Sequence, residues 1–166
     1  MVSQSNWTAR EFRCTGARAV AKMNNNRTRD SYSSGKSLRI LVVEDHSDTL
    51  QALSRLLAHF GHEISLADGA QNALNAIESE EFDVVLCDIV LPDGSGYDVV
   101  AHAKRKGPVT AVALSGFAAT EDIERGRQAG FDFYLGKPVD FHELRSVLGH
   151  RLSRQKKRAR RAVATS

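Results

Sequence analysis

The chain has 166 residues, 42% of them hydrophobic and 26% charged, and this length fits one domain with extensions. No apolar run approaches the roughly 20 residues that cross a bilayer, and the N-terminus lacks the apolar segment of a secretory signal, which argues against a membrane span and against export. The two cysteines, Cys14 and Cys87, lie far apart and argue against a disulfide framework, so the sequence favours a reducing, cytoplasmic location.

The charge of the chain is divided between its parts. Residues 1–36 carry seven Lys or Arg and two acids, a net of +5, and residues 151–166 carry seven basic residues and no acid, a net of +7. Residues 37–150 carry nine basic and eighteen acidic residues, a net of −9. The basic pI therefore describes the two ends of the chain. We expect a domain over residues 37–152 and a basic tail over residues 153–166.

Residues 1–36 are rich in Ser, Asn, Arg and Gly and show little periodicity, which is typical of a flexible arm. Apolar residues in this arm leave room for a short helix over Thr8–Lys22. The run Asn24–Asn26 breaks the amphipathic pattern that an organelle transit peptide would need, so we expect a basic flexible arm.

From Leu38 onwards, short apolar segments alternate with stretches in which apolar residues recur at helical spacing. The apolar segments show no polar alternation, as expected of strands buried on both faces of a parallel sheet. In chain order, strands are predicted over Ile40–Val43, Ile64–Ala67, Phe82–Cys87, Val109–Leu114 and Phe133–Leu135.

A helix is predicted after each strand. The helices are marked, in chain order, by Leu50, Leu53, Leu57 and Phe60, by Ala70, Ala73, Leu74 and Ile77, by Tyr97, Val100 and Ala101, by the more polar stretch Glu121–Ala129, and by Phe141, Leu144, Val147, Leu148 and Leu152. Gly61, Gly107 and Gly130 end the first, third and fourth of them. Five strand–helix units joined by right-handed crossovers give a doubly wound α/β sandwich.

Polar side chains follow four of the predicted strands. Glu44 and Asp45 come after the first strand, Asp88 after the third, Ser115 after the fourth and Lys137 after the fifth. In such a fold these strand ends meet at one edge of the sheet, where ligands bind. Three carboxylates there repel one another, and Mg²⁺, which prefers oxygen ligands, would compensate them. With a hydroxyl and an ammonium added, the edge predicts a site for a metal and a small anionic group, which is what phosphoryl transfer requires.

Four segments at these strand ends carry a resemblance to a known family. LVVEDHSD (41–48), VVLCDIVLPDGSG (84–96), VALSG (112–116) and FYLGKPVD (133–140) resemble, in order and spacing, the signature segments of response-regulator receiver domains. The resemblance covers roughly residues 38–150. It implies a (βα)5 flavodoxin-like three-layer sandwich whose five-stranded parallel sheet has the order 2-1-3-4-5, and a role as a phosphoacceptor in a two-component phosphorelay.

The resemblance also implies a ligand set for Mg²⁺. Asp88 would be the nucleophile that takes the phosphoryl group from a phosphohistidine. Asp45 would hold the metal together with Asp88, and Glu44 would do so directly or through water. The backbone carbonyl of Val90, two residues after the acceptor, would be the remaining protein ligand. We expect none of the six histidines to be a metal ligand.

Further roles follow from the same resemblance. Ser115 would bond one phosphoryl oxygen and Lys137 another. Tyr134 occupies the family's switch position, and the bond between Lys137 and Pro138 would be cis. Gly94 and Gly96 would permit a tight turn after the acceptor strand.

Some residues have plainer explanations. Asp93 and Asp98 are expected to be turn and cap residues, and Cys87 is expected to be a small buried hydrophobe. Taken by itself, Asp45 could be a cap of the first helix, although Ser47 or Asp48 would be a better one.

The leading hypothesis is a signalling switch and not an enzyme: a stand-alone receiver, or one related to the receivers of hybrid histidine kinases. It would catalyse only its own phosphorylation and dephosphorylation. Its partners would be a histidine kinase or a histidine phosphotransfer protein, and a downstream target that the sequence does not identify.

Two alternatives remain open at this point. A haloacid-dehalogenase-like phosphatase also uses a strand-end Asp with Mg²⁺, but it needs a second acid two residues later, where this chain has Val90. A regulator tethered to nucleic acid, or to another anionic surface, would act through the basic tails, although no aromatic residues interleave the C-terminal charge run.

Overall fold

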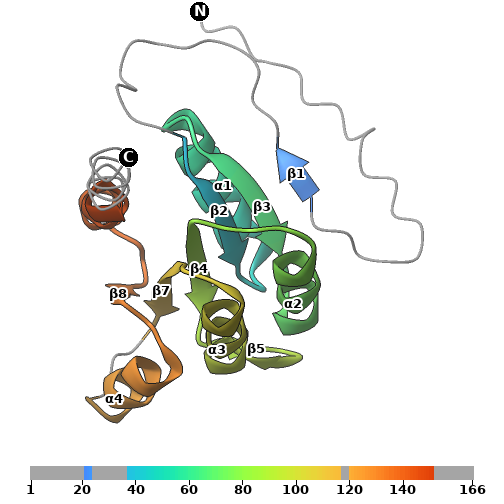
Figure 1. Cartoon of the computed structure of the whole chain (residues 1–166). Helices are drawn as coiled ribbons and strands as arrows, with labels where there is room; N and C mark the ends of the chain where they lie inside the picture. The colour runs from blue at the N-terminus through green and yellow to red at the C-terminus, as the bar shows by residue number, and fades with distance from the viewer. Residues whose placement is uncertain (1–20, 24–36, 117–119, 152–166) are drawn as a thin grey trace, which may run out of the picture.

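The structure, a computed structural model, describes residues 21–23, 37–116 and 120–151 (Figure 1). These residues form a six-stranded sheet in the order β1-β3-β2-β4-β7-β8. Its strands are β1 (Ala21–Met23), β2 (Arg39–Val43), β3 (Glu63–Ala67), β4 (Val84–Asp88), β7 (Thr110–Ser115) and β8 (Phe133–Gly136). All neighbours are parallel except β1 and β3. The five parallel strands follow the expected 2-1-3-4-5 order, so that prediction is confirmed.

Helices cover both faces of this sheet. They are α1 (Ser47–His59), α2 (Ala70–Ser79), α3 (Gly96–Lys106), α4 (Thr120–Ala129) and a last helix that covers residues 141–151. Successive side chains of a strand point to opposite faces. Leu41 and Val43 of β2 therefore pack with α2 and α3, whereas Ile40 and Val42 pack with α1 and the last helix. The predicted three-layer sandwich is confirmed.

Two glycines end helices as the sequence predicts. Gly61 follows α1 with a φ of 83°, and Gly130 follows α4 with a φ of 106°. Both values lie in the left-handed region, which a residue with a Cβ enters at a cost of roughly 1–2 kcal/mol. These positions fix where the chain turns back towards β3 and β8.

The N-terminal arm differs from the prediction. Residues 21–23 form β1, which lies antiparallel to β3 at the outer edge of the sheet, with Ala21, Lys22 and Met23 opposite Leu66, Ser65 and Ile64 (Figure 1). The short helix for which residues 8–22 left room is therefore wrong at its C-terminal end, because Ala21 and Lys22 lie in a strand. Residues 8–20 lie outside the described part. Three residues are too few to show the sequence periodicity of a strand. This strand forms because the edge of β3 offers unpaired backbone groups.

A short hairpin after β4 was also missing from the predicted elements. It consists of β5 (Val90–Leu91) and β6 (Gly94–Ser95), which pair antiparallel. The tight turn expected at Gly94 and Gly96 is present, and neither glycine reaches it through a positive φ. A Cβ on Gly96 would lie 2.1 Å from the carbonyl oxygen of Asp88, so the close approach of two backbone segments requires glycine there.

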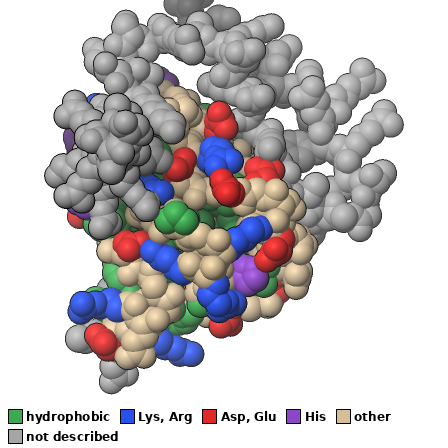
Figure 2. Space-filling model, viewed as in Figure 1, with side chains coloured by type: hydrophobic (Ala, Val, Ile, Leu, Met, Phe, Trp, Pro, Cys, Tyr) green, Lys and Arg blue, Asp and Glu red, His purple; other side chains and the backbone are tan. Residues whose placement is uncertain are grey.

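One face of the described residues carries charges of both signs. On the face shown in Figure 2, Lys and Arg side chains lie among Asp and Glu side chains and do not gather into a patch of one sign. Lys104 forms such an ion pair with Asp132 at 2.6 Å, and His102 lies within hydrogen-bond distance of Glu78 at 2.5 Å. No helix within the described ranges is both long enough and apolar enough to span a bilayer.

Candidate functional site

The register of the parallel strands brings the predicted site residues to one edge of the sheet. Val43, the residue before Glu44, is opposite Cys87 in β4. Asp88, the last residue of β4, is opposite Leu114, and Ser115 is opposite Gly136. Each polar residue therefore ends or follows its strand at the same level, as the sequence predicts.

Lys137 lies at the centre of this edge. Its ammonium nitrogen is 2.6 Å from Glu44 Oε2 and donates a hydrogen bond to Asp88 Oδ2. Partial burial lowers the pKa of Lys137, but the nearby carboxylates of Asp88 and Glu44 outweigh that effect, so the pKa lies above its ordinary value. The bond between Lys137 and Pro138 is cis, as expected. One cation thus joins two of the three predicted carboxylates.

Glu44 is fully buried. Its Oε1 accepts a hydrogen bond from the backbone N–H of His46 at 3.2 Å. Its Oε2 faces Lys137 but makes no hydrogen bond of good geometry with any described group, because the ion pair is short without being well aligned. A buried carboxylate oxygen with one imperfect partner is costly, and a further cation would reduce that cost.

Asp88 is held at both carboxylate oxygens. Oδ2 accepts from Lys137, and Oδ1 accepts from the backbone N–H of Val90 at 3.1 Å. Only 9% of Asp88 is exposed, and Val90 directs its side chain to solvent with 77% exposed. The Asp88 carboxylate is therefore held in one orientation by the chain at this edge of the sheet.

Asp45 completes the acidic group, and His46 lies against it. His46 Nδ1 is 3.0 Å from Asp45 Oδ1 and 3.2 Å from Glu44 Oε1. Hydrogen bonds to Glu44 and then to Asp45 raise the pKa of His46. The ligand atoms of these three residues all lie within 4.8 Å of one another. Neither Asp45, Ser47 nor Asp48 caps α1 by a side-chain hydrogen bond, since the cap residue is His46.

The donor set fits the expected Mg²⁺. Glu44, Asp45 and Asp88 offer carboxylate oxygens, and the buried Oε2 of Glu44 lacks a directional partner among the described groups. Hard oxygen ligands of this kind are those that Mg²⁺ takes, usually while keeping several waters. His46 belongs to the same group of possible ligands, although from the sequence we expected no histidine to bind the metal.

Ser115 and Lys137 are tied together through the backbone. The N–H of Lys137 donates to the carbonyl oxygen of Ser115 at 2.8 Å. Ser115 is half-buried at the end of β7, and the described chain continues to Gly116. The hydroxyl and the ammonium expected to act on the same group therefore come from adjacent strands with a fixed register.

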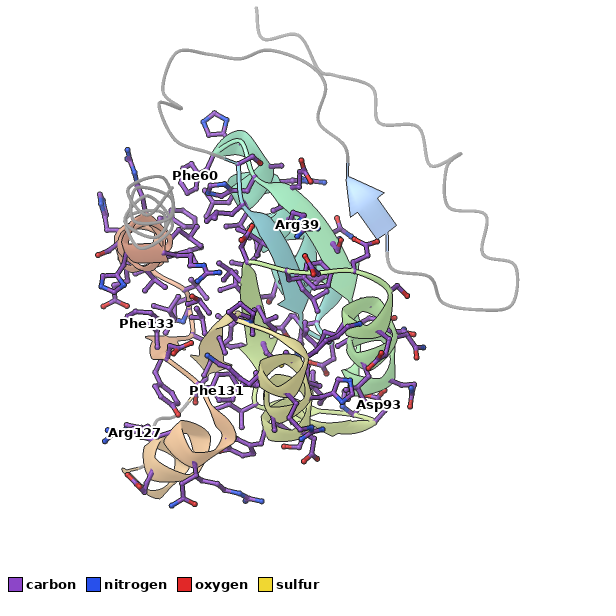
Figure 3. All side chains as sticks on the ribbon, in the orientation of Figure 1. Arg39, Phe60, Asp93, Arg127, Phe131 and Phe133 are labelled. Carbon is purple, nitrogen blue, oxygen red and sulfur yellow. The ribbon has the colours of Figure 1, made fainter. Side chains whose placement is uncertain are left out.

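Tyr134 packs against α4. Its hydroxyl donates to the carbonyl oxygen of Ile123 at 3.0 Å, and its ring centroid is 5.9 Å from that of Phe131, which lies in the region between α3 and α4 (Figure 3). A Cβ on Gly126 would lie 1.9 Å from the hydroxyl oxygen. Burial raises the pKa of Tyr134. The expected switch residue is thus fastened to a helix beside the site.

Two further expectations concern structural residues. The carboxylate of Asp93, at the tip of the hairpin in Figure 3, accepts from the N–H groups of Ala70 at 2.7 Å and Gln71 at 3.0 Å. It therefore caps α2, a helix that precedes it in the chain. Asp98 lies in the first turn of α3. Cys87 is a free, fully buried thiol whose pKa is raised by burial, as expected of a small hydrophobe.

Comparison with known proteins is consistent with this arrangement. A family model described as "Response regulator receiver domain" matches residues 40–149. The chain is 35% identical over 120 residues to the sensory/regulatory protein RpfC of Xanthomonas campestris pv. campestris, a match that covers 68% of this chain and 16% of that protein. The chain thus spans about a sixth of the length of this curated relative.

Solved structures show the same fold. A CheY-like response regulator receiver domain from Methanospirillum hungatei superposes with a TM-score of 0.70 at 31% identity, covering 74% of this chain and 99% of that one. The receiver domain of sensor histidine kinase PA1611 from Pseudomonas aeruginosa superposes with a TM-score of 0.63 at 27% identity, covering 71% and 99%.

Proposed function

Because this chain belongs to the response-regulator receiver family, we propose that Asp88 is the residue that accepts the phosphoryl group. As a member of this family, the chain is a receiver of a two-component phosphorelay, which is a signalling switch and not a conventional enzyme. The phosphatase alternative loses its support, since Val90 stands where that class of enzyme needs its second acid.

The observation that carries the proposal is the position of the Asp88 carboxylate. It ends β4 at the ligand-binding edge of the sheet, and Lys137 and the N–H of Val90 hold its two oxygens. A carboxylate so oriented can attack the phosphorus of a phosphohistidine, and the P–N bond breaks as the new P–O bond forms. Positioning and charge neutralisation supply most of the catalysis in such a transfer.

The proposed metal ligands are Glu44, Asp45, Asp88 and the backbone carbonyl of Val90. When bound, Mg²⁺ would neutralise charge on the phosphoryl oxygens. The relative from Pseudomonas aeruginosa is described with a magnesium ion coordinated in its active site cleft, which supports the same assignment here. The protein would position the ligand oxygens for the metal, through the buried side chain of Glu44 and the hairpin after β4.

Two side chains would hold the transferred group. Lys137 would exchange part of its contact with Asp88 for a phosphoryl oxygen, which keeps its positive charge beside developing negative charge. Ser115 would donate its hydroxyl to a second oxygen. Tyr134 would transmit this change to α4. It lies in β8, the strand that ends directly before Lys137, and its hydroxyl bonds to Ile123 of α4.

The phosphoryl donor is proposed to be a histidine kinase or a histidine phosphotransfer protein, acting in the cytoplasm. The similarity to the receivers of a sensory/regulatory protein and of a sensor histidine kinase supports a hybrid-kinase-like pathway. We propose the domain boundaries at residues 37 and 152, with the basic arm and tail outside them. The tail, residues 153–166, lies outside the described part of the chain.

The proposal can be tested by incubating the full chain with Mg²⁺ and acetyl phosphate and measuring the intact mass. Addition of one phosphoryl group is expected in the native protein and is expected to be absent in Asp88→Asn. Asp98→Asn, which changes an acid in the first turn of α3, is the matched control and should be labelled normally. Equal labelling of Asp88→Asn and the native protein would refute the assignment.

A further inference from the structure

His46 occupies a position that no predicted role explains. It follows the acidic pair, and its side chain is 74% exposed to solvent. An exposed imidazole is free to point away from the protein. Here Nδ1 instead lies 3.0 Å from Asp45 Oδ1 and 3.2 Å from Glu44 Oε1.

The chain itself places this ring. Glu44 is fully buried, so its carboxylate lies below the surface on which His46 stands. The backbone N–H of His46 donates to Glu44 Oε1, so the main chain and the imidazole turn towards the same oxygen. His46 is also the cap residue of α1, with extended backbone angles of −78° and 110°, which fixes its Cα at the helix start. The nitrogen is therefore held beside both carboxylates.

The two distances from His46 Nδ1 match the spacing of neighbouring ligands in a metal's coordination shell. In an octahedral site with metal–ligand distances of about 2.0–2.1 Å, neighbouring ligand atoms lie about 3.0 Å apart. The two distances from His46 Nδ1 are 3.0 and 3.2 Å, and all three ligand atoms lie within 4.8 Å of one another. Without a cation, a proton on Nδ1 can occupy the space between nitrogen and oxygen. A divalent cation can occupy the same space with the nitrogen unprotonated.

We infer that His46 Nδ1 is an additional ligand of the proposed metal site, which widens the site from Mg²⁺ to first-row transition divalent cations. The inference rests on the proposed function, since it extends the same metal site. Carboxylate oxygens favour Mg²⁺ and Mn²⁺, whereas an imidazole nitrogen adds affinity for Ni²⁺, Co²⁺ and Zn²⁺. This chain would therefore prefer Ni²⁺ over Mg²⁺ more strongly than an all-oxygen site does.

The first test uses Mn²⁺ bound to the full chain and pulsed electron paramagnetic resonance. A nitrogen hyperfine coupling from an imidazole is expected in the native protein and is expected to be lost in His46→Gln. His59→Gln changes an exposed histidine at the other end of α1 and should keep the coupling. Asp45→Asn should weaken Mn²⁺ binding itself.

The second test measures Ni²⁺ and Mg²⁺ affinities by titration calorimetry. In His46→Gln the Ni²⁺ affinity should fall on the order of tenfold, the scale on which changes near a metal alter its binding. The Mg²⁺ affinity should change much less. His59→Gln should alter neither affinity.

The outcomes separate the two proposals. Mn²⁺ binding that depends on Asp45 but shows no nitrogen coupling would overturn the role of His46 and leave the proposed metal site intact. A coupling that survives in His46→Gln would overturn it as well. If neither Mn²⁺ nor Mg²⁺ binds, the proposed metal site fails, and the role of His46 fails with it.

Discussion

The hydroxyl of Tyr134 donates a hydrogen bond to the carbonyl oxygen of Ile123, and this contact fastens β8 to α4. Lys137 follows β8 by one residue and reaches Glu44 and Asp88. The end of one strand therefore connects the proposed phosphorylation site to the helix beside it. Gly126 gives the tyrosine its room, since a Cβ there would meet the hydroxyl oxygen at 1.9 Å.

Gly126→Ala is expected to displace the Tyr134 side chain from α4. Alanine would gain about 1 kcal/mol of helix propensity over glycine. Overpacking against the tyrosine costs roughly 1–3 kcal/mol and opposes that gain. In a Tyr134→Phe background the closest clash is removed, so the substitution should be more favourable there by about 1 kcal/mol. Urea unfolding of the four proteins measures this coupling, and additive effects would contradict the packing argument.

Mg²⁺ is expected to stabilise the fold through the acidic cluster. A ligand at about ten times its dissociation constant stabilises the state that it binds by roughly 1.4 kcal/mol. The melting temperature should rise with added Mg²⁺ and return on chelation with EDTA. Asp45→Asn should abolish most of this response, whereas Asp98→Asn should retain it. A response equal in Asp45→Asn and the native protein would place the ion elsewhere.

Asp93 should make a pH-dependent contribution to stability through its cap of α2. Hydrogen bonds from Gln71 and Ala70 lower its pKa in the folded protein. A lowered folded pKa means that the stabilisation is present above the unfolded value of about 3.9 and is lost as the pH falls through the folded pKa. At pH 7, Asp93→Ala should therefore cost about 0.5–1 kcal/mol, the lower range for a cap.

The check is chemical denaturation of Asp93→Ala and the native protein between pH 7 and pH 3. The difference between them should shrink at the acid end. Asp98→Ala, which removes a first-turn acid of α3, serves as the control and should cost less. A constant difference across this range would show that charge on Asp93 is not what stabilises α2.

Deletion of residues 1–36 should expose the outer edge of β3. The strand β1 pairs with Ile64, Ser65 and Leu66, so those backbone amides should exchange with solvent faster in the truncated chain. Amides of β2, which lies between β3 and β4, should keep their protection. Hydrogen exchange with mass spectrometry separates the two strands. Unchanged exchange in β3 would mean that the arm does not cover this edge in solution.

The basic run of residues 151–166 predicts weak, nonspecific binding to nucleic acid. Contacts between basic side chains and phosphates release counterions, so such binding should weaken steeply with added salt. Fluorescence anisotropy with a labelled DNA duplex at several salt concentrations measures it. Deletion of residues 153–166 should remove the signal, and equal binding by the truncated chain would end the idea of a tethered regulator.

Local sequence patterns are enough to predict the alternation of strands and helices and the strand ends at which the site residues lie. A strand buried on both faces is a continuous apolar run, and a glycine with positive φ ends a helix, so Ile40–Val43, Gly61 and Gly130 were predicted from local chemistry. The residue after each such strand lies at the sheet's edge wherever the strands are parallel. The positions of Asp88 and Lys137 followed from that rule.

The contacts across that edge and around it depend on how the whole chain folds. Lys137 could have faced any of the three carboxylates, and it contacts Glu44 and Asp88 because the register of β2, β4, β7 and β8 brings these residues together. Asp93 caps a helix that begins 23 residues earlier, and β1 pairs with a strand some 40 residues later. No local pattern encodes such contacts, since they depend on where distant backbone groups are left unpaired once the sheet has formed.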